Sequence, residues 1–376
     1  MHRYRLILAL NLICNLVFYT GGVFATNTTH VAASLLYHVD SQIRQIDNCD
    51  ESIISFNDND VKNLWKELEL CLPTKNILEL QSLYTHAKML NQNNHTLESK
   101  EKYAEAKKLL YAIWRELCEI EESPTNLIQR KTSPSYNDFS TNPHTSKKYK
   151  KKVRPHLMPI DHEIKPKLDA IFCSTRATAD ANSFEAAGFT TFALQPRSFI
   201  RVAGHPSFPN HLLKVYLDTE LRKKRGEDGW IWFVRRCKGA EKIRKIIKKR
   251  KCKLFTVADK WIYPLPINPS TPIDPSYQQK SEVLVVTNMH LTTKEESLDA
   301  WKNMTKDHLK ELYSIISYAG GSSYREDNIP YTKSGHFAFI DTEHPYKIPN
   351  YENVAEYLSP EMKEYWYKLT RTGYTY

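Results

Sequence analysis

The stretch of sequence that decides the fold reads GGSSYREDNI at residues 320–329, and FIDTE follows it at residues 339–343. A hairpin is expected over residues 329–340, because two short apolar runs flank a turn that contains glycine. Such a hairpin would bring Asn328 and Asp341 together. Their amide and carboxylate oxygens are hard ligands of the kind that Mg²⁺ prefers. The alternative needs no metal: residues 327–328 would form an ordinary Asp-Asn turn, and Asp341 would be an unrelated aspartate at the end of a strand.

Regular elements are expected on the N-terminal side of this stretch. Residues 281–288 form a continuous apolar run, typical of a strand that is buried on both faces, and residues 306–318 are expected to be helical. Further upstream, expected strands at 198–204 and 211–218 are joined by a turn-rich segment. A long basic helix is expected over residues 229–253. This alternation of strands and helices indicates a mixed α+β domain.

Two charged side chains in these elements are candidates for a functional site. Lys214 lies in the middle of an expected strand, where a compact ammonium that faces a cleft could hold an anionic group, although an exposed strand lysine is ordinary. Glu241 shares a helix face with Val234 and Cys237, and it is the only acidic residue among residues 235–253, of which eleven are Lys or Arg. A carboxylate on a partly apolar face requires a cation. That cation is either Lys214 or a lysine of the same helix.

The order of these elements resembles the protein-kinase-like superfamily, including its aminoglycoside-kinase and choline-kinase branches. The resemblance implies that Lys214 holds nucleotide phosphates and that Glu241 orients it. It further implies that Asn328 and Asp341 hold Mg²⁺ beside bound ATP. The sequence VVTNMHL at residues 285–291 resembles the hinge between the two lobes, where backbone groups would bind adenine.

The chain departs from the superfamily at several points. Ser323 stands where the catalytic aspartate would lie, so Asp327 would have to act as the base. A glycine-rich nucleotide loop is missing, and the 35 residues after Asp341 are too few for a full helical C-terminal lobe. Two functions stay open: a phosphotransferase that depends on Mg²⁺ and nucleotide, or an interaction protein or effector on a degenerate, non-catalytic kinase-like scaffold.

Residues 26–121 are predicted to form a helical domain that serves as a binding or docking module. Its three expected helices have apolar residues at helical spacing: 31–46, 60–72 and 96–121. Residues 122–155 are rich in Ser, Thr, Pro and Asn and end in the basic run 147–152, which favours a linker with a basic tail. The expected fold is therefore α+β, with an N-terminal helical bundle and a divergent two-lobe kinase-like domain at 156–376 whose C-terminal lobe is short.

The first 25 residues are typical of a signal peptide. Two arginines precede an apolar run over residues 6–24, and Val23 and Ala25 supply the small residues that a signal peptidase recognises. A retained membrane anchor is the alternative, because the run is just long enough to span a bilayer. Cleavage is favoured since two asparagines and a Gly-Gly pair interrupt the run.

Three stretches are similar to those of exported proteins from chlamydia-related bacteria: residues 157–172, AGHP at residues 203–206 and WIYPLP at residues 261–266. This similarity covers about residues 156–370 and carries no established activity. It implies a host-associated bacterium. The protein would then be secreted or periplasmic, or delivered into a host cytosol that contains ATP.

The composition limits the remaining possibilities. Of the 376 residues, 41% are hydrophobic, which is sufficient for a packed core, and the net charge is +10. The positive charge favours an anionic partner surface, but no motif predicts a specific nucleic-acid site. The substrate would be an unknown protein or small molecule. Cys49, Cys71 and Cys118 lie in one region and could form disulfides whose pairing the sequence leaves open.

Overall fold

The computed structural model describes residues 23–48, 58–69, 74–93, 95–120, 134–194, 200–220, 228–321, 324–343 and 347–373. The protein is mixed, 55% helical and 12% strand, which confirms the α+β class. Within the described ranges, no helix is both long and apolar enough to cross a membrane. The expected signal peptide lies mostly outside these ranges, as do Cys49 and Cys71.

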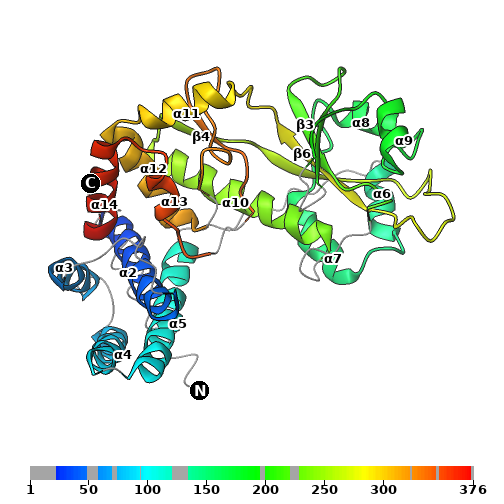
Figure 1. Ribbon diagram of the computed structural model, residues 1–376. Coiled ribbons are helices and arrows are strands. Elements are labelled where there is room, and N and C mark those ends of the chain that lie inside the picture. Colours follow the sequence, from blue (N-terminus) through cyan, green and yellow to red (C-terminus); the bar gives the residue numbers. More distant parts are fainter. Residues whose placement is uncertain are drawn as a thin grey trace.

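The main sheet has five strands and is antiparallel throughout (Figure 1). Its strand order is β1 (Thr190–Leu194), β2 (Arg201–Gly204), β3 (His211–Val215), β6 (Glu282–Thr287) and β5 (Lys260–Pro264). All but the last residue of β6 are buried, as its continuous apolar run predicts. A separate pair of parallel strands joins β4 (Phe255–Val257) to β7 (Phe337–Phe339).

The expected hairpin near residue 330 forms, but without two regular strands. Backbone hydrogen bonds join its arms: the Ala338 N–H donates to Pro330 O at 2.9 Å, and the Ile340 N–H donates to Asn328 O at 3.0 Å. Pro330 has no N–H to return. The second arm, β7, therefore finds its regular partner in β4.

Helix α10 (Gly229–Arg250) lies between the sheet and a large group of helices (Figure 1). It packs against β4 and β5 on the sheet side and against α12 (Lys306–Ala319) on the helical side. The helix was predicted to continue to residue 253. It ends at Arg250 because Lys251 takes a left-handed conformation with φ of 53°.

The N-terminal helices do not form a separate bundle. They are α2 (Val23–Asn48), α3 (Asp58–Glu69), α4 (Thr74–Gln92) and α5 (Thr96–Ile120), of which α4 was not predicted. Their buried side chains belong to the same hydrophobic cluster as those of α10, α12 and α14 (Pro360–Thr372). The helical part of the molecule is thus built from both ends of the chain.

The segment expected to be a linker is folded in its second half. Residues 134–156 contain α6 (Pro134–Thr141), α7 (Lys147–Val153) and a 3₁₀ turn (Arg154–His156). Tyr136 and Tyr149 are buried in one cluster with residues of β5 and β6. The lysines of the basic run lie on the outer side of α7, where Lys147, Lys148, Lys151 and Lys152 are exposed. Aromatic residues spaced through a polar segment therefore outweigh its loop-like composition.

The remaining helices are short. They are α8 (Lys165–Phe172), α9 (Ala181–Ala186), α11 (Lys294–Lys302) and α13 (Glu352–Ala355).

Candidate functional site

Four separate elements bring charged side chains together at the junction of the sheet and the helices. The central ion cluster consists of Lys214 from β3, Arg236 from α10, Lys260 from β5, and Asp341 and Glu343 from the segment that follows β7. These elements are far apart in the sequence. The cluster is therefore a product of the tertiary fold.

Arg236 is the centre of this cluster. Its Nε lies 3.2 Å from Asp341 Oδ1, and its Nη2 lies 2.6 Å from Glu343 Oε2. The side chain of Arg236 is 5% exposed, whereas that of Asp341 is 26% exposed, so the cluster meets solvent on the Asp341 side. A guanidinium that bridges two carboxylates fixes both of them.

The two lysines hold the backbone and the hydroxyl group of the same segment. Lys214 Nζ donates a hydrogen bond to Ile340 O at 3.4 Å. Lys260 Nζ donates to Thr342 Oγ1 at 2.8 Å, and Thr342 Oγ1 in turn donates to Arg236 O at 2.6 Å. Residues 340–343 are thereby connected to β3, β5 and α10.

The electrostatics of the cluster follow from this geometry. Burial alone would raise the pKa of the Asp341 carboxyl, but Arg236, Lys214 and Lys260 together lower that pKa below its usual value. Burial lowers the pKa of Lys214, and the charge of Asp341 opposes that effect. Burial and the nearby charge of Lys214 lower the pKa of Lys260 well below its usual value. Asp341 is therefore an ionised carboxylate among cationic groups.

The structure brings Lys214 and Asp341 together but gives Glu241 a different partner. Glu241 Oε1 lies 2.9 Å from His156 Nδ1, and among the described residues Glu241 forms no ion pair or hydrogen bond with Lys214. Arg236 is the residue of α10 that enters the cluster, and the sequence analysis missed it. Its position three residues after the buried Phe233 and four before the buried Ala240 is the signal that could have identified it.

The other predicted site residues lie on the neighbouring loop. Asn328 contacts the start of the segment 340–343 through its backbone carbonyl, which accepts the hydrogen bond from the Ile340 N–H. Asp327, the candidate base, has a side chain that is 53% exposed and lies 2.8 Å from Arg325 Nη2. Ser323 lies outside the described residues.

The residues at Asp341 fit a divalent cation poorly. Both nearby carboxylates are already bound to Arg236, and Lys214 lies close by. A metal would have to displace a buried guanidinium and then share the site with ammonium groups. The described part of the chain also contains no group of three or more His, Cys, Asp and Glu side chains that could hold a metal ion.

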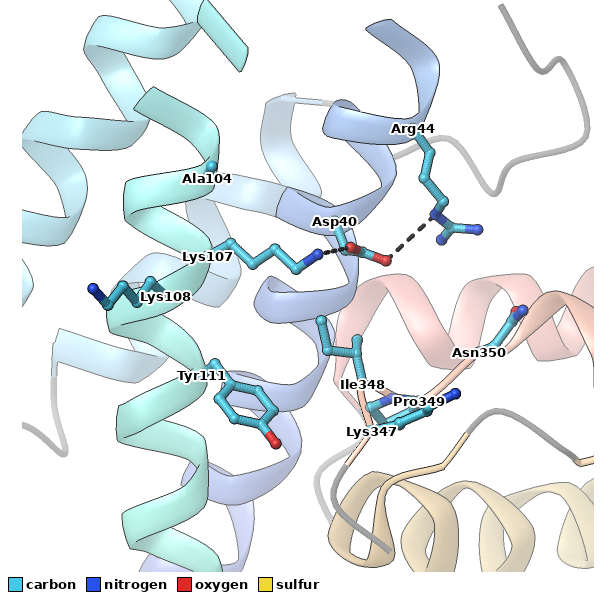
Figure 2. Close-up of a pocket in the computed structure, with 10 residues that line it drawn as sticks. All are labelled: Asp40, Arg44, Ala104, Lys107, Lys108, Tyr111, Lys347, Ile348, Pro349 and Asn350. Carbon is cyan, nitrogen blue, oxygen red and sulfur yellow. Dashed lines mark hydrogen bonds and ion pairs between the residues drawn. The ribbon is translucent and has the colours of Figure 1, made fainter. Parts of the chain in front are cut away.

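A concave surface lies outside the ion cluster, and none of its residues was predicted. It is a hollow of about 670 Å³ between α2, α5 and residues 347–350 (Figure 2). Asp40 stands at its edge and binds both Lys107 and Arg44, the latter at 3.4 Å. Its cations, Arg44, Lys107, Lys108 and Lys347, outnumber this one carboxylate, so the hollow is a basic surface.

Comparisons of the chain with protein-family models, with curated proteins and with solved structures find no match.

Proposed function

We propose that the protein is an interaction protein built on a non-catalytic kinase-like scaffold, in which the central ion cluster is structural. The proximity of Lys214 and Asp341 supports a kinase-like scaffold. Lys214 lies on a strand of an antiparallel sheet, and Asp341 follows the hairpin 329–340. In this proposal the five-stranded sheet corresponds to one lobe. Helices from both ends of the chain correspond to the other lobe, which supplies the helices that the short C-terminus lacks.

The observation that carries the non-catalytic part is the bridge from Arg236 to Asp341 and Glu343. A phosphotransferase of this type needs its aspartate to hold Mg²⁺ and its lysine to hold phosphates. Here the guanidinium of Arg236 is ion-paired with Asp341, and the Lys214 ammonium lies 3.4 Å from the Ile340 carbonyl oxygen. The ion pairs join α10 to the segment that follows β7, and hydrogen bonds from Lys214 and Lys260 join that segment to the sheet, as structural groups would.

Exchange of Asp341 for Asn tests this proposal. Loss of one charge from a buried pair is expected to cost on the order of 3 kcal/mol of unfolding free energy. The proposal requires the same loss of unfolding free energy in EDTA as in Mg²⁺ with ATP, because neither Mg²⁺ nor ATP binds at Asp341. Thermal and urea unfolding of the parent and of Asp341→Asn under both conditions measure it.

Asp327→Asn is the matched control, because Asp327 is exposed and should change stability by no more than about 0.5 kcal/mol. In the alternative, a phosphotransferase dependent on Mg²⁺ and nucleotide, the parent would be stabilised by Mg²⁺ with ATP. Asp341→Asn would lose that response, and Asp327→Asn would lose turnover. This set of results would contradict the structural proposal.

We further propose that the protein is exported and that its partner presents an anionic surface. The basic hollow of Figure 2 and the exposed lysines of α7 support such a partner through their charge. The apolar run that precedes α2 supports export. Mass spectrometry of the mature N-terminus tests the expected cleavage after Ala25, which would remove only the first three residues of α2.

A further inference from the structure

A smaller hollow of about 230 Å³ lies on the other side of the sheet junction, where α7, the first turn of α10 and the start of β6 meet. Three aromatic side chains, Tyr149, Tyr216 and Trp230, contribute to its wall, and the carboxyl of Glu282 contributes to its lining. No part of this hollow belongs to the central ion cluster.

Glu282 is buried without full hydrogen bonding. It is 7% exposed, and its Oε2 accepts a hydrogen bond from the Tyr149 hydroxyl at 2.8 Å. No donor from the described residues bonds to Glu282 Oε1. Burial raises the pKa of Glu282 to about 7.

The aromatic rings give the hollow its preference for a cation. The rings of Tyr149 and Trp230 meet edge to face, with centroids 5.3 Å apart and an interplanar angle of 86°. Aromatic faces attract ammonium groups, and a nearby carboxylate strengthens that attraction. An ammonium group could also donate a hydrogen bond to Glu282 Oε1.

Among the described residues that line the hollow, two carboxylates face one ammonium group, so this lining is net negative when Glu282 is ionised. Arg176 is a further cation whose charge acts on Glu282, and it is ion-paired with Asp218. Asp228 adds a second carboxylate and accepts a hydrogen bond from Trp230 Nε1 at 3.3 Å. Lys280 opposes these charges, but its ammonium donates to Glu220 O at 3.0 Å. His144 also lines the hollow.

We propose that this hollow binds a primary alkylammonium group, whose N–H donates to Glu282 Oε1 and whose charge lies against the rings of Trp230 and Tyr149. The volume suits a chain of a few carbon atoms. Two sources share this chemistry, namely a free small amine and the side chain of a lysine.

Titration of the full chain with n-butylammonium chloride tests the proposal, with calorimetry and tryptophan fluorescence as readouts at constant ionic strength. Saturable binding is expected, and n-butanol, a neutral molecule of similar size, should bind at least about tenfold more weakly because it lacks the charge. Nα-acetyl-lysinamide separates the two sources: binding comparable to n-butylammonium indicates a lysine side chain, and binding of n-butylammonium alone indicates a free amine.

Variants and pH provide the controls. Glu282→Gln keeps the shape and removes the charge, so it should weaken binding about tenfold or more, and Trp230→Leu should weaken it as well. Glu295→Gln, on the exposed face of α11, should have no effect. Binding to the parent should weaken as the pH falls below about 7, by up to tenfold per unit, because Glu282 becomes protonated while the amine stays charged.

The Glu282→Gln profile should be flat, which would assign the pH dependence of binding to Glu282. Equal affinities for n-butylammonium and n-butanol would overturn the proposal. Unchanged affinity in a folded Glu282→Gln protein, or no saturable binding of either amine, would overturn it too.

Discussion

Glu282 is a buried acid whose cost to stability depends on pH. Its pKa is about 7 in the folded protein against an ordinary value of 4.5, and burial is the main cause. Between these values the folded chain binds more protons than the unfolded chain. The free energy of unfolding therefore falls as the pH rises from about 4.5 to 7, and it stays lower above that range.

Replacing Glu282 by Gln should remove this pH-dependent cost. At pH 8 the variant is expected to be more stable than the parent by about 3 kcal/mol, and the difference should approach zero near pH 4. Urea unfolding of both proteins at pH 4, 6 and 8 measures the effect. Glu295→Gln, at an exposed position, should show no such trend. If the difference in unfolding free energy between parent and Glu282→Gln is the same at all three pH values, the pKa of Glu282 is the same in the folded and the unfolded chain, contrary to this prediction.

Among the elements, α10 shows most clearly where prediction from sequence succeeds and where it fails. Its apolar periodicity predicts that Ile243, Ile246 and Ile247 face inward; the first two are buried, and Ile247 is partly buried. The same periodicity places Lys242, Lys245 and Lys249 on a solvated side. Lys242 is instead 3% exposed, and its Nζ lies 5.8 Å from the centre of the Tyr318 ring. The prediction was wrong because α10 packs against strands and against α12 at once, so more than one face is buried.

The same two-sided packing explains why the candidate site was only partly predicted. The order of elements was sufficient to indicate that Lys214 and Asp341 belong together. It could not indicate that Arg236 rather than Glu241 would meet them, because the choice depends on how α10 is rotated against the segment 341–343. The helical spacing of Arg236 from Phe233 and Ala240 places it on a buried face, but the segment that it meets there is set by long-range packing.

Gly239 is the residue that allows this close packing, and its replacement by Ala tests the point. An added Cβ would lie 2.1 Å from Thr342 O, which is a backbone atom. In an ordinary helix interior the change from Gly to Ala raises stability by about 1 kcal/mol. Here it is expected to lower the free energy of unfolding by about 1–3 kcal/mol, because α10 or the segment 341–343 must shift.

Chemical denaturation of Gly239→Ala and of Lys248→Ala measures this effect. Lys248 is exposed on the same helix, so its variant should remain within about 0.5 kcal/mol of the parent. An increase in stability of Gly239→Ala would mean that α10 does not approach Thr342 so closely.

For the whole molecule, the most important feature is the core that both ends of the chain share. Trp114 of α5 is 0% exposed and donates a hydrogen bond to Ser317 O of α12 at 3.0 Å. Ser34 of α2 is hydrogen-bonded to the Tyr313 hydroxyl, also on α12, at 2.7 Å. Helical periodicity predicted that residues 31–46 and 96–121 form helices. It could not predict their partners, because local patterns carry no information about which distant apolar face covers them.

The N-terminal helices are therefore expected to be necessary for folding of the rest of the chain. A fragment of residues 134–376 would expose the faces of α12 and α14 that α2, α3 and α5 cover, including the fully buried Tyr313 and Ile316. It should lack a cooperative thermal transition by circular dichroism and should be cleaved rapidly by protease. A chain of residues 23–376 is the matched control and should unfold in one transition. Co-expression with residues 23–120 should restore protection, since the missing contacts are non-covalent. A cooperative, protease-resistant 134–376 fragment would instead mean that the helical segment is an independent domain.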